Sequence, residues 1–169
     1  MRQSSVIATC GVMAALGVVI MVIGGVLGIG MYVSPLIVGF MLIPFGEKYG
    51  MKYQMSMWIV ISILSLILVP NIEQNLMFLC LFGPYPILYP HFQKLPKGIR
   101  MLAKLAFFNV TVVALELLIM KVLVPEVMAP ALLIGMLAAS NVVFVCYDKL
   151  IPRASIVIDR YAKLLRGKK

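Results

Sequence analysis

The stretch Leu81–Arg100, LFGPYPILYPHFQKLPKGIR, brings helix breakers, aromatic residues and a positive cluster together in one place. Its first part lies inside an apolar run, where a proline removes a helical hydrogen bond and clashes with the preceding turn. Gly83, Pro84 and Pro86 therefore predict a kink or a break in a helix. The last part predicts a polar loop, and its basic residues are Lys94, Lys97 and Arg100.

The chain on both sides of this stretch consists of long apolar segments. The 169 residues are 63% hydrophobic and 12% charged, and the mean hydropathy is +1.06. Soluble domains are about 45–50% apolar and about 25% charged. A soluble fold of this length cannot bury so much apolar surface, because small domains keep a large ratio of surface to volume. Lipid must solvate most of the chain, which excludes an ordinary soluble protein.

These segments predict an all-α, polytopic membrane protein with six transmembrane helices. The expected segments are residues 6–29, 31–45, 53–69, 72–89, 102–124 and 127–147. A helix needs about 20 residues to span a bilayer, so the second segment is short. Pro44 and Gly46 are expected to close that segment, and a short polar loop with Glu47, Lys48 and Lys52 is expected after it.

The distribution of positive charge predicts the orientation. With six spans, every Lys and Arg except Lys121 falls on one side, and cytoplasmic loops carry such an excess. Residues 1–150 are therefore expected to form a transmembrane domain with both termini in the cytoplasm. Residues 151–169 predict a basic amphipathic tail helix on the membrane surface; a cytoplasmic site for a partner is the alternative. Topology and anionic headgroups explain the net charge of +9, so no nucleic-acid partner is expected.

The predicted break at residues 83–86 has two interpretations. In lipid, an interrupted helix is tolerated only where protein or a water-filled cavity covers the freed carbonyl groups. The first interpretation is a discontinuous helix at a binding site or in a moving element. The second is a packed kink, with Tyr85 and Tyr89 as anchors at the membrane interface.

Polar residues inside the spans are the candidates for a binding site. Glu116 is the one ionisable side chain deep in a span, and such a carboxyl group is costly in a membrane and usually functional. It could pair with Lys121, be protonated, bind a cationic or hydrogen-bonding ligand, or bond to a neighbouring span. Asn109 and Asn141 are expected to bond to each other across the fifth and sixth segments, and contact with a substrate is the alternative.

Glu73, Gln74 and Asn75 lie at the predicted outer mouth. They are expected either to bind a ligand or to form a solvated turn.

No catalytic residue, metal site or cofactor is predicted, and the chain is not expected to be an enzyme. His91 is the single histidine and falls in the predicted cytoplasmic loop, without a nucleophile near it in sequence. Cys10, Cys80 and Cys146 lie within apolar segments without the spacing of metal ligands, so neither a disulfide framework nor a zinc site is predicted.

Small residues on the first segment allow close approach of another helix. Ala8, Gly11 and Ala15 follow one another at helical spacing, and Gly11 and Ala15 lie one turn apart. These residues could pack against a neighbouring span of the same chain, or they could form a docking face for another subunit.

With six predicted spans, both termini inside and these small residues, the chain resembles the substrate-binding (S) subunits of energy-coupling-factor transporters. The resemblance implies a compact six-helix protein of the bacterial cell membrane that binds a vitamin or trace compound near its outer face. It also implies docking through Ala8, Gly11 and Ala15 onto a transmembrane T subunit driven by two cytoplasmic ATPases. The chain departs from the family in the short connection near residues 28–32 and in outer loops too short for an obvious lid.

Other functions stay open on the sequence alone. The stretch FGPYPILYP also resembles a segment of uncharacterised membrane proteins of Gram-positive bacteria. A membrane scaffold or assembly protein that transports nothing is the main alternative to an importer subunit. A small channel or carrier ranks third, because it would need a polar path along several spans and only the fifth segment shows a continuing polar face.

Overall fold

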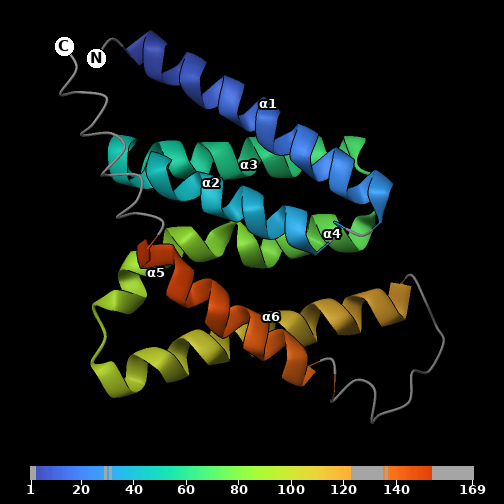
Figure 1. Cartoon of the computed structure of the whole chain (residues 1–169), viewed down its shortest axis with the longest axis vertical. Helices are drawn as coiled ribbons and strands as arrows, with labels where there is room; N and C mark the ends of the chain where they lie inside the picture. Colours follow the sequence, from blue (N-terminus) through green and yellow to red (C-terminus); the bar gives the residue numbers. More distant parts are fainter. Residues whose placement is uncertain (1–2, 29, 31, 123–134, 136, 154–169) are drawn as a thin grey trace. The chain divides into compact units, whose positions relative to one another are not determined.

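A computed structural model describes residues 3–28, 30, 32–122, 135 and 137–153 of the chain. The regular structure among these residues is entirely helical (Figure 1), which confirms the all-α class. The elements are α1 (Gln3–Leu27), α2 (Val33–Tyr49), α3 (Met51–Leu68), α4 (Ile72–Met77), the π-helical turn η1 (Phe78–Phe82), α5 (Pro84–Gln93) and α6 (Lys97–Val122). Residues 137–153 form a further helix. The first part of the expected sixth segment and the predicted tail helix beyond residue 153 lie outside the described residues.

Three of the helices are long and apolar enough to cross a membrane. Their candidate spans are Ser4–Leu27, Met51–Leu68 and Lys97–Ile119. In these three spans, only 28%, 28% and 22% of an apolar 18-residue stretch is buried within the protein. So much exposed apolar surface is unfavourable in water, and it is compatible with a membrane protein whose helices face lipid.

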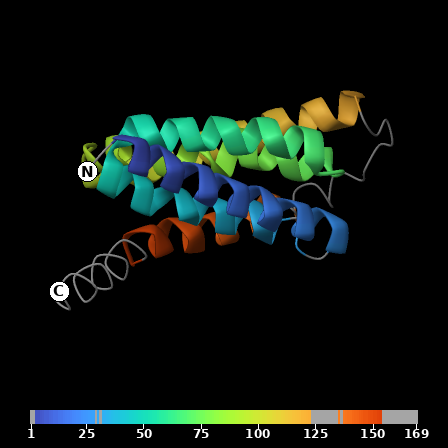
Figure 2. The same cartoon turned by 90° about the horizontal axis from the view of Figure 1, so that it is seen from above.

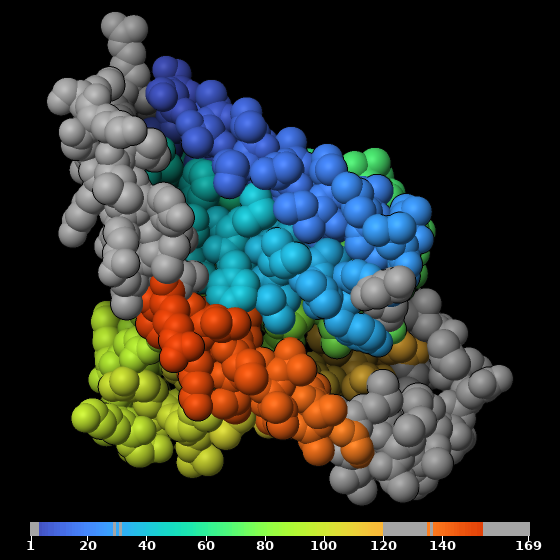
Figure 3. Space-filling view, viewed as in Figure 1, coloured from blue at the N-terminus to red at the C-terminus, as the bar shows by residue number. Residues whose placement is uncertain are grey.

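The described residues fall into two compact units, residues 3–87 with 150–153 and residues 88–149. In the first unit, α1, α2 and α3 pack side by side, and η1 packs against α2 and α3 (Figures 1 and 2). Figure 3 shows α1 and α2 in contact along one face of this unit. Its largest fully buried side chains include Met21, Val38, Leu42, Met57, Ile61, Phe78 and Tyr85.

Helix α2 is longer than the sequence predicted. It continues through Pro44 and Gly46 to Tyr49, so the expectation that these residues close the helix is wrong. A proline removes one helical hydrogen bond, but packing of α2 between α1 and α3 stabilises the helix across that position. Gly46 contributes to this packing, because a Cβ atom there would overlap the side chain of Gln54, a buried residue of α3.

The connection between α2 and α3 is a single residue, Gly50. Its φ angle is 93°, a conformation that favours glycine because other residues carry a Cβ atom. Glu47 and Lys48 therefore belong to the last turns of α2, and Lys52 belongs to the first turn of α3. The polar loop expected around these three residues is wrong.

The second unit contains the last part of α5, the whole of α6 and most of the helix at residues 137–153. Phe108 and Phe144 stack with their ring centres 4.3 Å apart. Asn109 and Asn141 exchange two hydrogen bonds, and each Nδ2 lies 2.9 Å from the Oδ1 of the other residue. The predicted bond between these two asparagines is confirmed, and such interhelical bonds contribute about 0.6–2 kcal/mol in a membrane.

His91 lies in α5, so its expected place in a loop is wrong.

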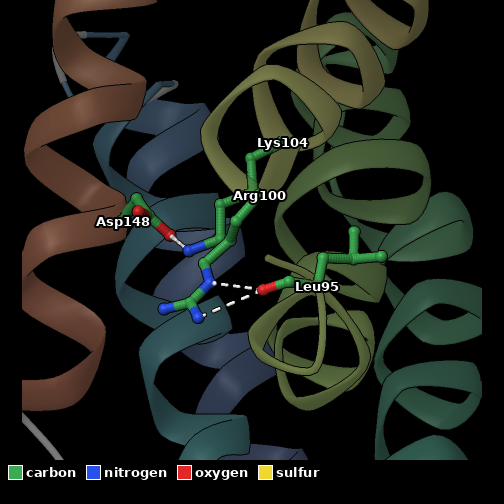
Figure 4. A network of polar contacts seen from close by, with 4 residues as sticks. All are labelled: Leu95, Arg100, Lys104 and Asp148. Carbon is green, nitrogen blue, oxygen red and sulfur yellow. Dashed lines mark hydrogen bonds and ion pairs between the residues drawn. The ribbon is translucent and has the colours of Figure 1, made fainter. Parts of the chain in front are cut away.

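An ion pair between the buried Lys104 and the partly buried Asp148 joins α6 to the helix at residues 137–153. Lys104 Nζ lies 2.6 Å from Asp148 Oδ1, and the two side chains are 4% and 14% exposed (Figure 4). The same nitrogen lies 4.4 Å from the centre of the Tyr89 ring, so a cation–π contact also compensates the lost hydration of the ammonium group.

We expect Asp148→Asn to lower the free energy of unfolding by about 3–5 kcal/mol, because the variant leaves the buried Lys104 without a counter-ion. Denaturant-induced unfolding in detergent micelles measures this loss. The control is the double variant Lys104→Met/Asp148→Leu, which buries no charge and should recover most of the stability. A double variant as unstable as the single one would show that the unpaired charge is not the cause.

Candidate functional site

The predicted ligand residues Glu73, Gln74 and Asn75 lie on α4, the short helix that follows α3. Asn71 begins this helix, because its Oδ1 accepts a hydrogen bond of 3.1 Å from the Gln74 backbone N–H. Glu73 accepts a hydrogen bond of 2.7 Å from the Tyr32 hydroxyl group, which ties α4 to the start of α2. Gln74 and Asn75 are buried, so the alternative of a solvated turn is wrong for these two residues.

The side chain of Gln74 is fully buried between α1 and α2. Its Nε2 donates to Met21 O at 2.8 Å and to Ser34 Oγ at 2.9 Å. A Cβ atom on Gly25 would lie 3.0 Å from Gln74 Oε1, so the missing side chain on α1 makes room for this amide group. Gln74 Oε1 itself is buried and accepts no hydrogen bond from the described part of the chain.

Asn75 on α4 and Ser62 on α3 also have buried polar atoms without a hydrogen-bond partner among the described residues. Asn75 Nδ2 donates to Val69 O at 3.2 Å, at the end of α3. Asn75 Oδ1 and Ser62 Oγ are buried without a partner among the described residues. A buried polar atom without a partner typically costs about 1–3 kcal/mol, and such atoms in native proteins call for an explanation, such as a bound water, ion or ligand.

Among residues 3–90, Glu73 is the one charged residue near α4. From residue 3 to residue 90 the charged side chains are Glu47, Lys48, Lys52 and Glu73. The first three lie at the turn between α2 and α3, at the far end of both helices from α4. The carboxylate of Glu73 and the amide oxygens beside it therefore favour hydrogen-bond donors or a cation.

Glu116 lies on α6 in the second unit, so the predicted ligand residues are divided between the two units. Its side chain is partly buried. It follows Asn109 by two helical turns and the buried Val112 by about one, so these three residues share one side of α6. The side chain of Lys121, one of the partners considered for Glu116, lies outside the described part of the structure.

The predicted docking residues Ala8, Gly11 and Ala15 are exposed on α1. A Cβ atom on Gly11 would meet no described atom within 4 Å. Packing of these residues against another described span of the chain is therefore wrong. The face of α1 that does pack within the unit carries Ala14, Gly17, Val18, Met21 and Gly24.

The predicted break at Gly83, Pro84 and Pro86 coincides with a change of helix type. The Gly83 N–H donates to Phe78 O at 2.8 Å, which closes the π-helical turn η1. Pro84 then begins α5, with Pro86 in its first turn. Prolines in the first helical turn are tolerated, because the N–H groups of that turn have no partner within the helix.

Trp58 of α3 packs directly on Gly83, a contact that sequence spacing did not indicate. A Cβ atom on Gly83 would overlap the indole ring at Cδ1 and Nε1. Trp58 Nε1 is buried and has no hydrogen-bond partner among the residues described. The interruption of the helix thus provides the gap that admits the indole ring, and π-helical turns of this kind often occur at functional sites.

Other chemistry is sparse in the described part of the chain. All three cysteines are free thiols. Within the described ranges, no group of three or more His, Cys, Asp or Glu side chains could hold a metal ion.

Comparisons with known proteins give no match: no protein-family model, curated protein or solved structure is similar to this chain. The function is therefore proposed from the chain's own residues. The buried oxygens of Gln74 and Asn75 and the exposed face of α1 are its two most informative features.

We expect Gly83→Ala to lower the free energy of unfolding by about 1–3 kcal/mol, because the added methyl group displaces the Trp58 ring. Trp58 is the single tryptophan of the chain, so its fluorescence emission reports on this contact and should move to longer wavelength. The control is Gly98→Ala on α6, where a Cβ atom would meet no described atom within 4 Å. Alanine favours a helix by about 0.5–1 kcal/mol over glycine, so this control should be at least as stable as the wild type. Unchanged emission and stability in Gly83→Ala would contradict the contact.

Proposed function

We propose that this chain is a six-span protein of the bacterial cell membrane with both termini in the cytoplasm. Three described helices satisfy the length and hydropathy of a span. Helix α2, with 17 residues, is close to that length, and α4, η1 and α5 follow one another along residues 72–93 with Gly83 between the last two. The helix at residues 137–153 supports a sixth span. The excess of Lys and Arg on one side supports the orientation.

We infer that its function is to bind a small molecule, as the substrate-binding subunit of a micronutrient importer. The observation that carries this proposal is the pair of buried oxygens, Gln74 Oε1 and Asn75 Oδ1, which accept no hydrogen bond from the described residues. A chain that only needed to fold would be more stable with apolar residues at these positions, because a buried unpaired acceptor is costly. A ligand that donates hydrogen bonds would recover that cost.

The chemistry of these residues defines the class of ligand. The unpaired atoms on α4 are both acceptors, and Glu73 adds a carboxylate in the same helix. We therefore expect a ligand with N–H or O–H donors, or a positive charge. Glu116 on α6, in the second unit, is a separate candidate for binding such a ligand, in keeping with the default expectation for an ionisable residue inside a span.

Energy for transport would come from partner subunits. The sequence contains no glycine-rich phosphate-binding loop, so ATP hydrolysis would take place in cytoplasmic ATPases joined to the chain through a transmembrane T subunit. The exposed small residues Ala8, Gly11 and Ala15 would let a helix of that partner approach the α1 backbone closely.

We expect a small molecule to co-purify with the wild-type protein and to be lost from Gln74→Leu. Leucine at position 74 should leave the fold intact, because Ser34 Oγ keeps its 2.7 Å bond to Gly30 O and Met21 O lies within α1. Mass spectrometry of extracts from protein purified in mild detergent measures the bound molecule.

The matched control for this experiment is Gln54→Leu, which replaces another buried glutamine of the same unit, on α3. This variant should retain the molecule. A wild-type protein that carries no small molecule after purification from its native membrane would contradict ligand binding, and equal retention in Gln74→Leu would contradict the placement on α4.

We expect Gly11→Leu to abolish co-purification of an ATPase-bearing complex from native membranes, because a large side chain keeps the partner helix away from α1. The variant should fold normally, since a Cβ atom at this position meets open space. The control Val12→Leu enlarges a side chain that is already exposed on the same helix, and it should retain the complex.

The same pull-down distinguishes an importer subunit from the alternative function, a membrane scaffold or assembly protein. A membrane scaffold or assembly protein would use the exposed α1 face for its partners, so Gly11→Leu would release proteins other than ATPases. Such a protein would carry no small molecule, and Gln74→Leu would leave its partners unchanged.

A further inference from the structure

The turn between α5 and α6 and the first turn of α6 carry positive charge. Lys94 lies in the turn, but Lys97 and Arg100 belong to α6, so the loop predicted for these two residues is wrong. Lys94 and Lys97 are exposed and Arg100 is partly exposed. Residues 88–115 contain no Asp or Glu. Among the described residues, Asp148 is the acidic residue that lies near this end of the unit, and it is partly buried in the ion pair with Lys104. The pair neutralises that acid, so Asp148 does not compensate the surface cations.

Arg100 is held in a fixed position at this turn. Its Nε and Nη2 atoms donate to Leu95 O at 3.4 Å and 3.2 Å, and Figure 4 shows the guanidinium group turned toward that carbonyl oxygen. Two of its five N–H groups are used in this way, and the others are available for a planar anion such as a phosphate. Pre-orientation lowers the entropy lost when an anion binds.

Large exposed apolar side chains lie on the opposite side of α6 from Lys97 and Arg100. Ile99 and Leu102 are 56% and 69% exposed, and Val110 continues the exposed apolar surface along α6. The candidate span Lys97–Ile119 begins within the same turn. Charged groups therefore stand at the end of an apolar helix, as they do in segments whose aliphatic part enters the acyl region and whose charges reach the headgroups.

We propose that the α5–α6 basic patch (Lys94, Lys97 and Arg100) binds the phosphate of an anionic phospholipid. The cations match the charge of the headgroup, and the apolar span that begins at Lys97 matches the acyl chains. Neither a free phosphate ion nor an acidic protein segment would need cations at the start of a membrane span. This interaction is independent of the ligand proposed for α4.

The test is a titration of fluorescently labelled phosphatidylglycerol into the full chain in neutral detergent micelles. We expect saturable binding that weakens as salt rises, and much weaker binding of phosphatidylcholine with the same acyl chains. Lys94→Gln/Lys97→Gln should lower the affinity for phosphatidylglycerol roughly 10- to 30-fold, because each basic residue near an anionic headgroup contributes about fivefold. Arg100→Lys keeps the charge but loses the planar donor group, so it should also bind more weakly.

The matched control is Lys48→Gln/Lys52→Gln, which removes the same charge from the turn between α2 and α3, where both lysines are exposed. This control should bind phosphatidylglycerol like the wild type. Circular dichroism and the thermal midpoint without lipid verify that each variant is folded. An equal loss of affinity for phosphatidylglycerol in the control would show that any exposed lysine contributes in the same way, and it would overturn the proposal. Equal binding of phosphatidylcholine, competition by inorganic phosphate at similar concentration, or preference for an acidic peptide would also overturn it.

Discussion

Lipid offers no hydrogen bonds, so every polar group of a membrane-spanning helix needs a partner within the protein. Much of the described structure follows from this constraint. Hydroxyl groups bond back to their own helices, as Thr111 does to Phe107 O at 2.8 Å. The two asparagines of the second unit satisfy each other, and its buried lysine is neutralised by Asp148. In a membrane these contacts would satisfy the polar groups, and the contacts between helices also fix which helix faces meet.

The exceptions to this constraint are concentrated in the first unit. Gln74 Oε1 and Asn75 Oδ1 on α4 and Trp58 Nε1 on α3 are buried without a partner among the described residues. The π-helical turn η1 connects α4 directly to the Trp58 contact at Gly83. The part of the unit with the most unsatisfied polar groups is thus also the part with irregular helical geometry, and π-helical turns are frequent at functional sites.

Glycine has two separate uses in this chain. Gly25 and Gly83 permit close contacts within the first unit, with the amide of Gln74 and with the ring of Trp58. A Cβ atom on Gly11 would meet no described atom within 4 Å, so the α1 backbone is accessible there. A small residue in a membrane helix allows close approach of any neighbour, and only its surroundings decide whether that neighbour belongs to the same chain.

The sequence alone determined the all-helical class, most helix positions and the bond between Asn109 and Asn141, because composition and helical periodicity are local properties. It did not determine that α2 continues through Pro44, that His91 lies in α5 or that Gln74 is buried. Those outcomes depend on packing between helices, which can stabilise a helix across a proline and remove a polar side chain from solvent. The two faces of α1 both carry small residues at helical spacing. Only the tertiary structure decided which face is buried, because burial depends on segments far away in the chain.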